Sequence, residues 1–206
     1  MLCLAHSASA ATITVPVTLN SNEGSVSGSG NAAQYSDSFT NSSLANFSMN
    51  LAVTITSLQG VVADVNGIGA NGTALLTGAE SVSVAFSATP VLGTINSLQI
   101  VSITLYDLTN APFENASTSF GNFNGTAAPN TNSSFVVAGP VIDPGPFATT
   151  FTFSANVGSY SVAGFTAEFD VTPAPAAVPE PSTWLAILGV AGVLGVRRWR
   201  RSAVTA

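Results

Sequence analysis

The side chains that most often carry enzyme chemistry are nearly absent from this sequence of 206 residues. Its single histidine is His6, its single cysteine is Cys3, and its only four basic residues are arginines between positions 197 and 201. Residues 7–196 therefore cannot supply a Ser-His-Asp or Cys-His nucleophile pair, a Ser-Lys pair, a basic phosphate clamp or a histidine-ligated zinc site. Only carboxylates and hydroxyls remain as reactive groups.

Nine carboxylates precede the C-terminal segment, and none belongs to a recognisable catalytic constellation. Glycoside hydrolysis needs only two suitably placed carboxylates, so a glycoside-active enzyme is the least favoured alternative. We interpret the acids as surface charges that keep the protein in solution, and we expect no enzymatic activity and no cofactor. They are Glu23, Asp37, Asp64, Glu80, Asp107, Glu114, Asp143, Glu168 and Asp170.

Calcium is the ion that these residue types would suit, because carboxylates, Asn side chains and loop carbonyls supply oxygen ligands. The segment Asp64-Val65-Asn66-Gly67 resembles the start of an Asp/Asn loop, but the remaining ligand positions do not follow. Asp64 and Asn66 are therefore weak calcium candidates. A calcium-dependent adhesive or carbohydrate-binding module is the alternative function.

The elements that must position these groups are strands. Apolar and polar residues alternate with period two over residues 13–19, 47–55, 82–86 and 101–105, where Val101 is expected to point inward with Ile103 and Leu105. Pro16 predicts that the first of these is an edge strand. With no amphipathic helix, residues 11–171 are expected to form an all-β, antiparallel β-sandwich or jelly roll of about 7–9 strands. Residues 109–133 are predicted to be a long loop or irregular strands.

The final pair of alternating segments predicts a specific register. Gly158-Ser159 is expected to form a two-residue hairpin turn, with Phe153 opposite Phe165. The alternation slips at Ala163-Gly164, which predicts a β-bulge there.

Charged residues make up only 7% of the chain, and the formal net charge is −6. With no base before Arg197, the body cannot neutralise phosphates, so a nucleic-acid partner is excluded. At the N-terminus, Ala8-Ser9-Ala10 is a cleavage site of the A-x-A type. We interpret residues 1–10 as the remnant of a signal peptide that is cut once, before Ala11, at the site formed by Ala8 and Ala10. Its translation start was assigned too far downstream.

The sequence of the C-terminus predicts a short membrane anchor. A Pro-rich linker (172–183) leads to the apolar span 184–196, which predicts a transmembrane helix with Trp184 at its entrance. Residues 197–206 form a basic tail expected to remain cytoplasmic. Its anchoring residues are Arg197, Arg198, Trp199, Arg200 and Arg201.

The motif Val178-Pro179-Glu180-Pro181-Ser182-Thr183, the apolar span and the arginine cluster follow one another in this order. Together they closely resemble the PEP-CTERM protein-sorting tail. The resemblance is confined to residues 178–201. It implies recognition by an exosortase in the inner membrane of a Gram-negative bacterium, cleavage near the Pro-Glu-Pro motif, and transfer of the cargo from a transient inner-membrane intermediate to the cell surface or extracellular matrix. It further implies an association with exopolysaccharide and biofilm.

Overall fold

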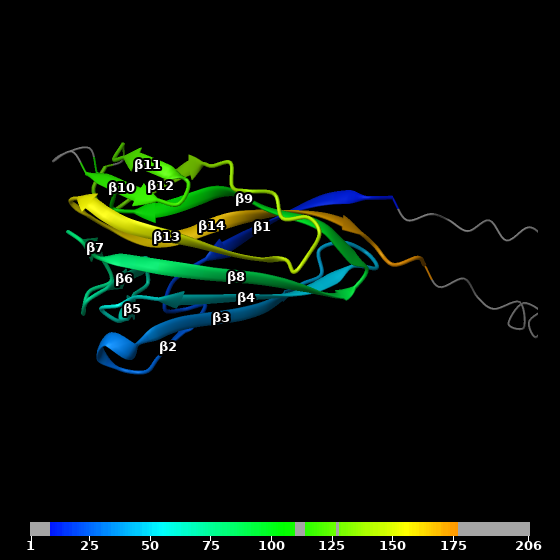
Figure 1. The fold of residues 1–206 in the computed structure, drawn as a ribbon, viewed down its shortest axis with the longest axis horizontal. Helices are drawn as coiled ribbons and strands as arrows, with labels where there is room; N and C mark the ends of the chain where they lie inside the picture. Colours follow the sequence, from blue (N-terminus) through cyan, green and yellow to red (C-terminus); the bar gives the residue numbers. More distant parts are fainter. Residues whose placement is uncertain (1–8, 110–113, 127, 177–206) are drawn as a thin grey trace, which may run out of the picture. The chain divides into compact units, whose positions relative to one another are not determined.

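The computed structural model describes residues 9–109, 114–126 and 128–176. These residues form an all-β fold in which two antiparallel sheets pack face to face (Figure 1). The described part contains fourteen strands and one short 3-10 turn at Gly30–Ala32, so the predicted fold class is confirmed. The strands are more numerous than the 7–9 expected, because several are only two to five residues long.

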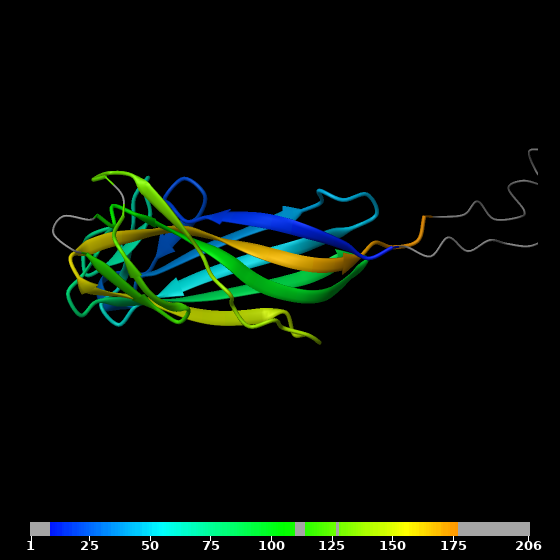
Figure 2. The same ribbon diagram turned by 90° about the horizontal axis from the view of Figure 1, so that it is seen from above.

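The first sheet, here called sheet A, is built around its longest strand. Its strands are β12 (Asn132–Val136), β9 (Thr94–Tyr106), β14 (Ser159–Thr172), β6 (Ile68–Ala70) and β5 (Val61–Ala63), with β1 (Ala11–Thr18) and β7 (Leu76–Thr77) also paired to β14. Among the described residues β1 pairs only with β14, beside which it lies in Figure 2, so Pro16 sits on an edge strand as predicted.

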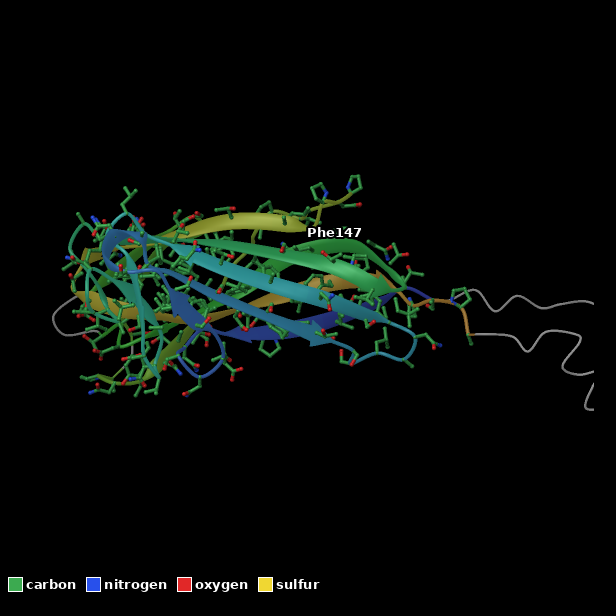
Figure 3. The ribbon with its side chains drawn as sticks, turned by 90° about the horizontal axis from the view of Figure 1, so that it is seen from below. Phe147 is labelled. Atoms are coloured by element: carbon green, nitrogen blue, oxygen red, sulfur yellow. The ribbon has the colours of Figure 1, made fainter. Side chains whose placement is uncertain are left out.

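The second sheet, sheet B, covers the other side of the core. Its order is β11 (Gly121–Asn124), β10 (Asn115–Thr118), β13 (Ala148–Val157), β8 (Ser81–Leu92), β4 (Ser48–Thr56), β3 (Gln34–Asn41) and β2 (Ser25–Ser27). Phe147, labelled in Figure 3, precedes β13 and packs partly buried against the core. Residues 109–133, expected to be a loop or irregular strands, contain β10, β11 and the beginning of β12.

The core between the sheets is rich in phenylalanine. The rings of Phe86 and Phe151 from sheet B both pack edge-on against Phe165 of sheet A, at centroid distances of 5.0 and 5.2 Å. Edge-to-face pairs at this distance are attractive, beyond the burial of their apolar area. In strands such as β4 and β8 the apolar residues therefore face the core as predicted, and the Ser, Thr and Asn residues between them face outward.

The predicted hairpin between the last two strands is wrong. β13 pairs with β8 and β10 in sheet B, whereas β14 pairs with β9 and β1 in sheet A, so the chain crosses between the sheets at Gly158. Phe153 lies opposite Val82, and Phe165 lies opposite Ile103. Two strands with matching apolar faces can form either a hairpin or two facing layers of a sandwich, and here each finds a long partner in its own sheet.

The predicted bulge is present, although its partner is a different strand. Val162 pairs with Leu105 and Gly164 with Thr104, which leaves Ala163 as the extra residue against β9. A second irregularity sets Ala167 opposite Ile100 and leaves Val101 unpaired. The inward position expected for Val101 is therefore wrong: Ile100 is buried in its place.

All of these strands lie in the first of the two units into which the chain divides, Met1–Ala174 and Pro175–Ala206. The predicted transmembrane helix at 184–196 falls outside the described residues. In the part of the chain that the structure describes, no helix is long and apolar enough to cross a membrane.

Candidate functional site

The residues predicted to direct sorting lie beyond the described part of the chain. This holds for the motif from Val178 to Thr183, for the anchor from Trp184 to Arg201, and for Ala8 of the cleavage site. Ala10 is described, and it lies exposed directly before β1.

Two buried carboxylates of the body hold backbone in place. Glu114 accepts hydrogen bonds through Oε2 from the backbone N–H and the hydroxyl of Thr109, at 2.6 and 2.9 Å, and through Oε1 from the N–H of Ser159 at 3.1 Å. It thereby fixes the corner at which the chain changes sheets. Glu80 accepts from the N–H and the hydroxyl of Thr77 at 2.8 and 3.1 Å and closes the turn before β8.

Three further carboxylates also have hydrogen-bond partners within the fold. Asp64 Oδ1 accepts from the N–H groups of Asn66 and Gly67, at 2.7 and 3.0 Å, in the turn between β5 and β6. Asp107 accepts from the Asn130 N–H, and Asp170 from the Thr12 hydroxyl, both at 2.7 Å. The calcium candidates Asp64 and Asn66 thus belong to a closed turn. Over the described ranges, no group of three or more His, Cys, Asp or Glu side chains could hold a metal ion.

Among the described residues, two neighbouring groups with altered pKa values lie on β3 of sheet B. Asp37 occupies an inward position between Tyr35 and Phe39, where burial raises the pKa of its carboxyl and the charge of Glu23 raises it further, against the lowering effect of the Ser38 backbone. Burial, followed by the charge of Asp37, raises the pKa of the Tyr35 hydroxyl to about 12. Within the described chain this group contains no Lys, Arg or His, so only a carboxylate could serve as a base in it.

The outer face of sheet B is an uncharged layer of small side chains. Residues paired across four neighbouring strands form continuous rows on this face, none of them buried. One row consists of Ser36, Thr54, Ala85 and Thr150, and the next of Ser38, Ala52, Ser87 and Ala148. Hydroxyls at this density can donate and accept hydrogen bonds, but they offer no activated nucleophile.

The outer face of sheet A carries a groove that the sequence analysis did not identify. It lies over the bulge at Ala163 and Gly164 and has a volume of about 250 Å³. The only signal for it in the sequence was the break in alternation at that bulge. We call it the bulge groove; its lining consists of Pro16, Val17, Thr18, Asn20, Val65, Asn66, Thr104, Tyr106, Asn132, Ala163, Gly164, Phe165 and Thr166.

Comparison with known proteins finds a match for the tail and none for the body. Residues 177–201 match the family model of the PEP-CTERM protein-sorting motif, as the resemblance predicted. No curated protein and no solved structure matches the chain. The motif indicates a protein that is exported and sorted by an exosortase.

Proposed function

We propose that this exosortase-sorted, exported chain is a non-enzymatic protein of the cell surface or extracellular matrix, whose β-sandwich associates with exopolysaccharide. The sorting motif at residues 177–201 is the observation that carries the proposal. A tail of this kind gives the body a destination outside the cell, and the body must then act without further help from the tail once it has been cut.

The side chains of the body support a binding role over a catalytic one. Residues 9–176 contain no Lys, Arg or His. The buried acids Glu80 and Glu114 are already engaged with backbone N–H groups. What the two sheets offer to the outside is a surface of hydroxyls and amides, which can form many weak hydrogen bonds to the hydroxyl groups of a polysaccharide.

The tail acts as a temporary anchor in this proposal. The span 184–196 would hold the chain in the inner membrane with the arginines on the cytoplasmic side, and the stiff Pro-rich linker would keep the Pro-Glu-Pro motif clear of the folded body. Cleavage near Glu180 would then release the body from its only basic residues.

Substitution within the motif tests the sorting step. In cells with an intact exosortase, Glu180→Ala should leave the chain uncut in the inner-membrane fraction, whereas wild type should reach the surface or medium with a mass reduced by the lost tail. Pro175→Ala, in the linker outside the matched segment, is the matched control and should be sorted normally. Normal cutting of the Glu180→Ala chain, or of wild type in cells without the exosortase, would refute exosortase sorting.

Removal of the polysaccharide tests the destination. In cells that cannot make exopolysaccharide, the cut protein should shift from the matrix fraction to the medium, while its cleavage continues. An unchanged distribution would show that the matrix association is wrong and would leave the sorting step intact.

A further inference from the structure

We propose that the bulge groove is a binding site for a neutral sugar unit of a polysaccharide chain. This inference rests on the proposed association with exopolysaccharide and assigns it to one place on the molecule. The shape of the groove floor, the chemistry of its walls and the absence of charged lining residues support it.

The floor of the groove is a point on the sheet where a side chain is missing. Gly164 lies between Thr18 of β1 and Thr104 of β9, so the central strand has no side chain between these two threonines, and Gly164 itself is buried. A Cβ added to Gly164 would lie 2.3 Å from the carbonyl oxygen of Val17, which excludes any larger residue without a shift of β1. The bulge at Ala163 adds a local bend. Together the two residues produce a depression at this point of the sheet.

The walls come from segments that are distant in sequence. Tyr106 and Asn132 are paired neighbours on β9 and β12. On the opposite side, the turn that carries Val65 and Asn66 is held beside the end of β1, because the Ser21 N–H donates to the Asp64 carbonyl at 2.8 Å. An aromatic ring, an exposed apolar side chain and amide groups thus surround a single depression.

This combination suits a sugar ring. The face of a tyrosine ring offers a flat apolar surface to the C–H groups of a sugar, and Val65, which is 62% exposed, adds another. The side-chain amides of Asn66 and Asn132 each provide two donors and one acceptor for sugar hydroxyls. The Tyr106 hydroxyl is oriented toward Asn130, to whose Oδ1 it donates at 3.4 Å.

The absence of charged side chains from the groove favours a neutral ligand. None of its thirteen lining residues is charged. Two nearby acids, Asp64 and Asp107, direct their Oδ1 atoms to backbone N–H groups. An acidic sugar would find no cation in residues 9–176 and would be repelled by the net negative charge of the body. A single shallow site binds weakly, but many copies at a cell surface would bind a repeating polymer by avidity.

The test uses the full chain and the exopolysaccharide of the producing cells, separated by anion exchange into a neutral and an acidic fraction. Calorimetry should detect binding of the neutral fraction and none of the acidic fraction. Tyr106→Ala should weaken binding of the neutral fraction by about ten-fold, the upper range for loss of an aromatic contact, and Asn132→Ala should weaken it several-fold. Asn132 is exposed, and no hydrogen bond of its side chain is seen among the described residues, so its variant should fold normally.

Thr150→Ala, on the outer face of sheet B, is the matched control and should bind like wild type. If the neutral fraction binds wild type and both groove variants equally, the exopolysaccharide association stands and the groove assignment is overturned. Preference for the acidic fraction would overturn the ligand class. If neither fraction binds, both the groove and the exopolysaccharide association fail, while exosortase sorting, tested separately through Glu180, is unaffected.

Discussion

At the scale of single residues, the acids of this protein serve the fold more clearly than they serve any reaction. Glu114 is the strongest example, because its two oxygens together receive three hydrogen bonds from two separate segments. The sequence reading of the nine acids as surface charges was therefore too simple. The burial of Glu80 and Glu114 could not be predicted from the sequence, because both residues lie in segments without clear apolar–polar alternation.

Glu114→Gln should lower the free energy of unfolding by about 1–3 kcal/mol, the usual range when a buried hydrogen-bonded group loses a partner. An amide at this position can present only one acceptor oxygen, so its NH₂ group must face either the Thr109 or the Ser159 N–H. Urea unfolding measures the change. Asp143→Asn, at an exposed position, is the control and should change stability by no more than about 0.5 kcal/mol. Equal effects of the two substitutions would contradict the structural role of Glu114.

Substitution of Asp37 is expected to have the opposite effect on the free energy of unfolding, because the charged form of its carboxyl is disfavoured in the folded state. β2 ends its pairing at Ser36, so from Asp37 onward β3 is the edge of sheet B. An inward-pointing charge on an edge strand hinders pairing with another chain, which is a physical reason to retain it at some cost in stability. Asp37→Asn should therefore raise the free energy of unfolding at pH 7, by up to about 0.5 kcal/mol as is usual for a partly exposed position.

The effect of Asp37→Asn on the free energy of unfolding is expected to depend on pH. Because the pKa of folded Asp37 is raised above 3.8, the folded state holds the proton more tightly than the unfolded chain. The carboxyl group therefore favours folding most below pH 3.8, and this advantage is lost as pH rises through the folded pKa. The gain from Asn should be largest at pH 7 and should shrink toward pH 4 in urea unfolding. A gain that is equal at both pH values would exclude ionisation as its cause.

At the scale of elements, alternation predicted the strands with clear apolar faces and missed those without. Residues 47–55 were recognised as a strand because apolar and polar residues alternate there. The apolar set is buried as expected: Phe47, Met49, Leu51, Val53 and Ile55. β3 was missed because its inward positions include Asp37 and Asn41 as well as Tyr35 and Phe39. The bulge at Ala163 was predicted because it shifts the phase of the pattern. The strand that pairs with the bulge was not predicted correctly, because a shift in the pattern does not identify the neighbouring strand.

Engineered disulfides can test the change of sheets at Gly158. In a Cys3→Ser background, the pair Ser83→Cys and Thr152→Cys should oxidise readily, because these residues lie directly opposite each other on β8 and β13. Ala155→Cys with Val162→Cys should not, because the residues belong to different sheets, which pack about 10 Å apart. Mass spectrometry after oxidation detects whether each pair has formed a disulfide. A disulfide in the second pair would restore the hairpin that the sequence first indicated.

At the scale of the whole molecule, the sequence located the sorting signal but not the candidate binding site. The signal is a contiguous motif and can be read from adjacent residues. The bulge groove instead joins residues from β1, β9, β12 and β14 and from the turn after β5, and only the pairing of these strands brings them together. Uncharged Asn, Thr and Tyr are also common throughout the chain, so their presence alone marked no site.

The distribution of charge makes a prediction for the molecule as a whole. Residues 9–176 carry nine acids and no base, so side-chain ion pairs cannot form among the described residues and the charges of the body only repel. Raising NaCl from 0.01 to 0.15 M shortens the screening length from about 30 to about 8 Å. The Tm of the full chain should therefore rise by a few degrees over this range, since about 1 kcal/mol corresponds to 2–4 °C for a domain of this size. Sucrose at equal osmolarity is the control for non-electrostatic effects, and a Tm that does not rise with salt would contradict a destabilising charge repulsion within the body.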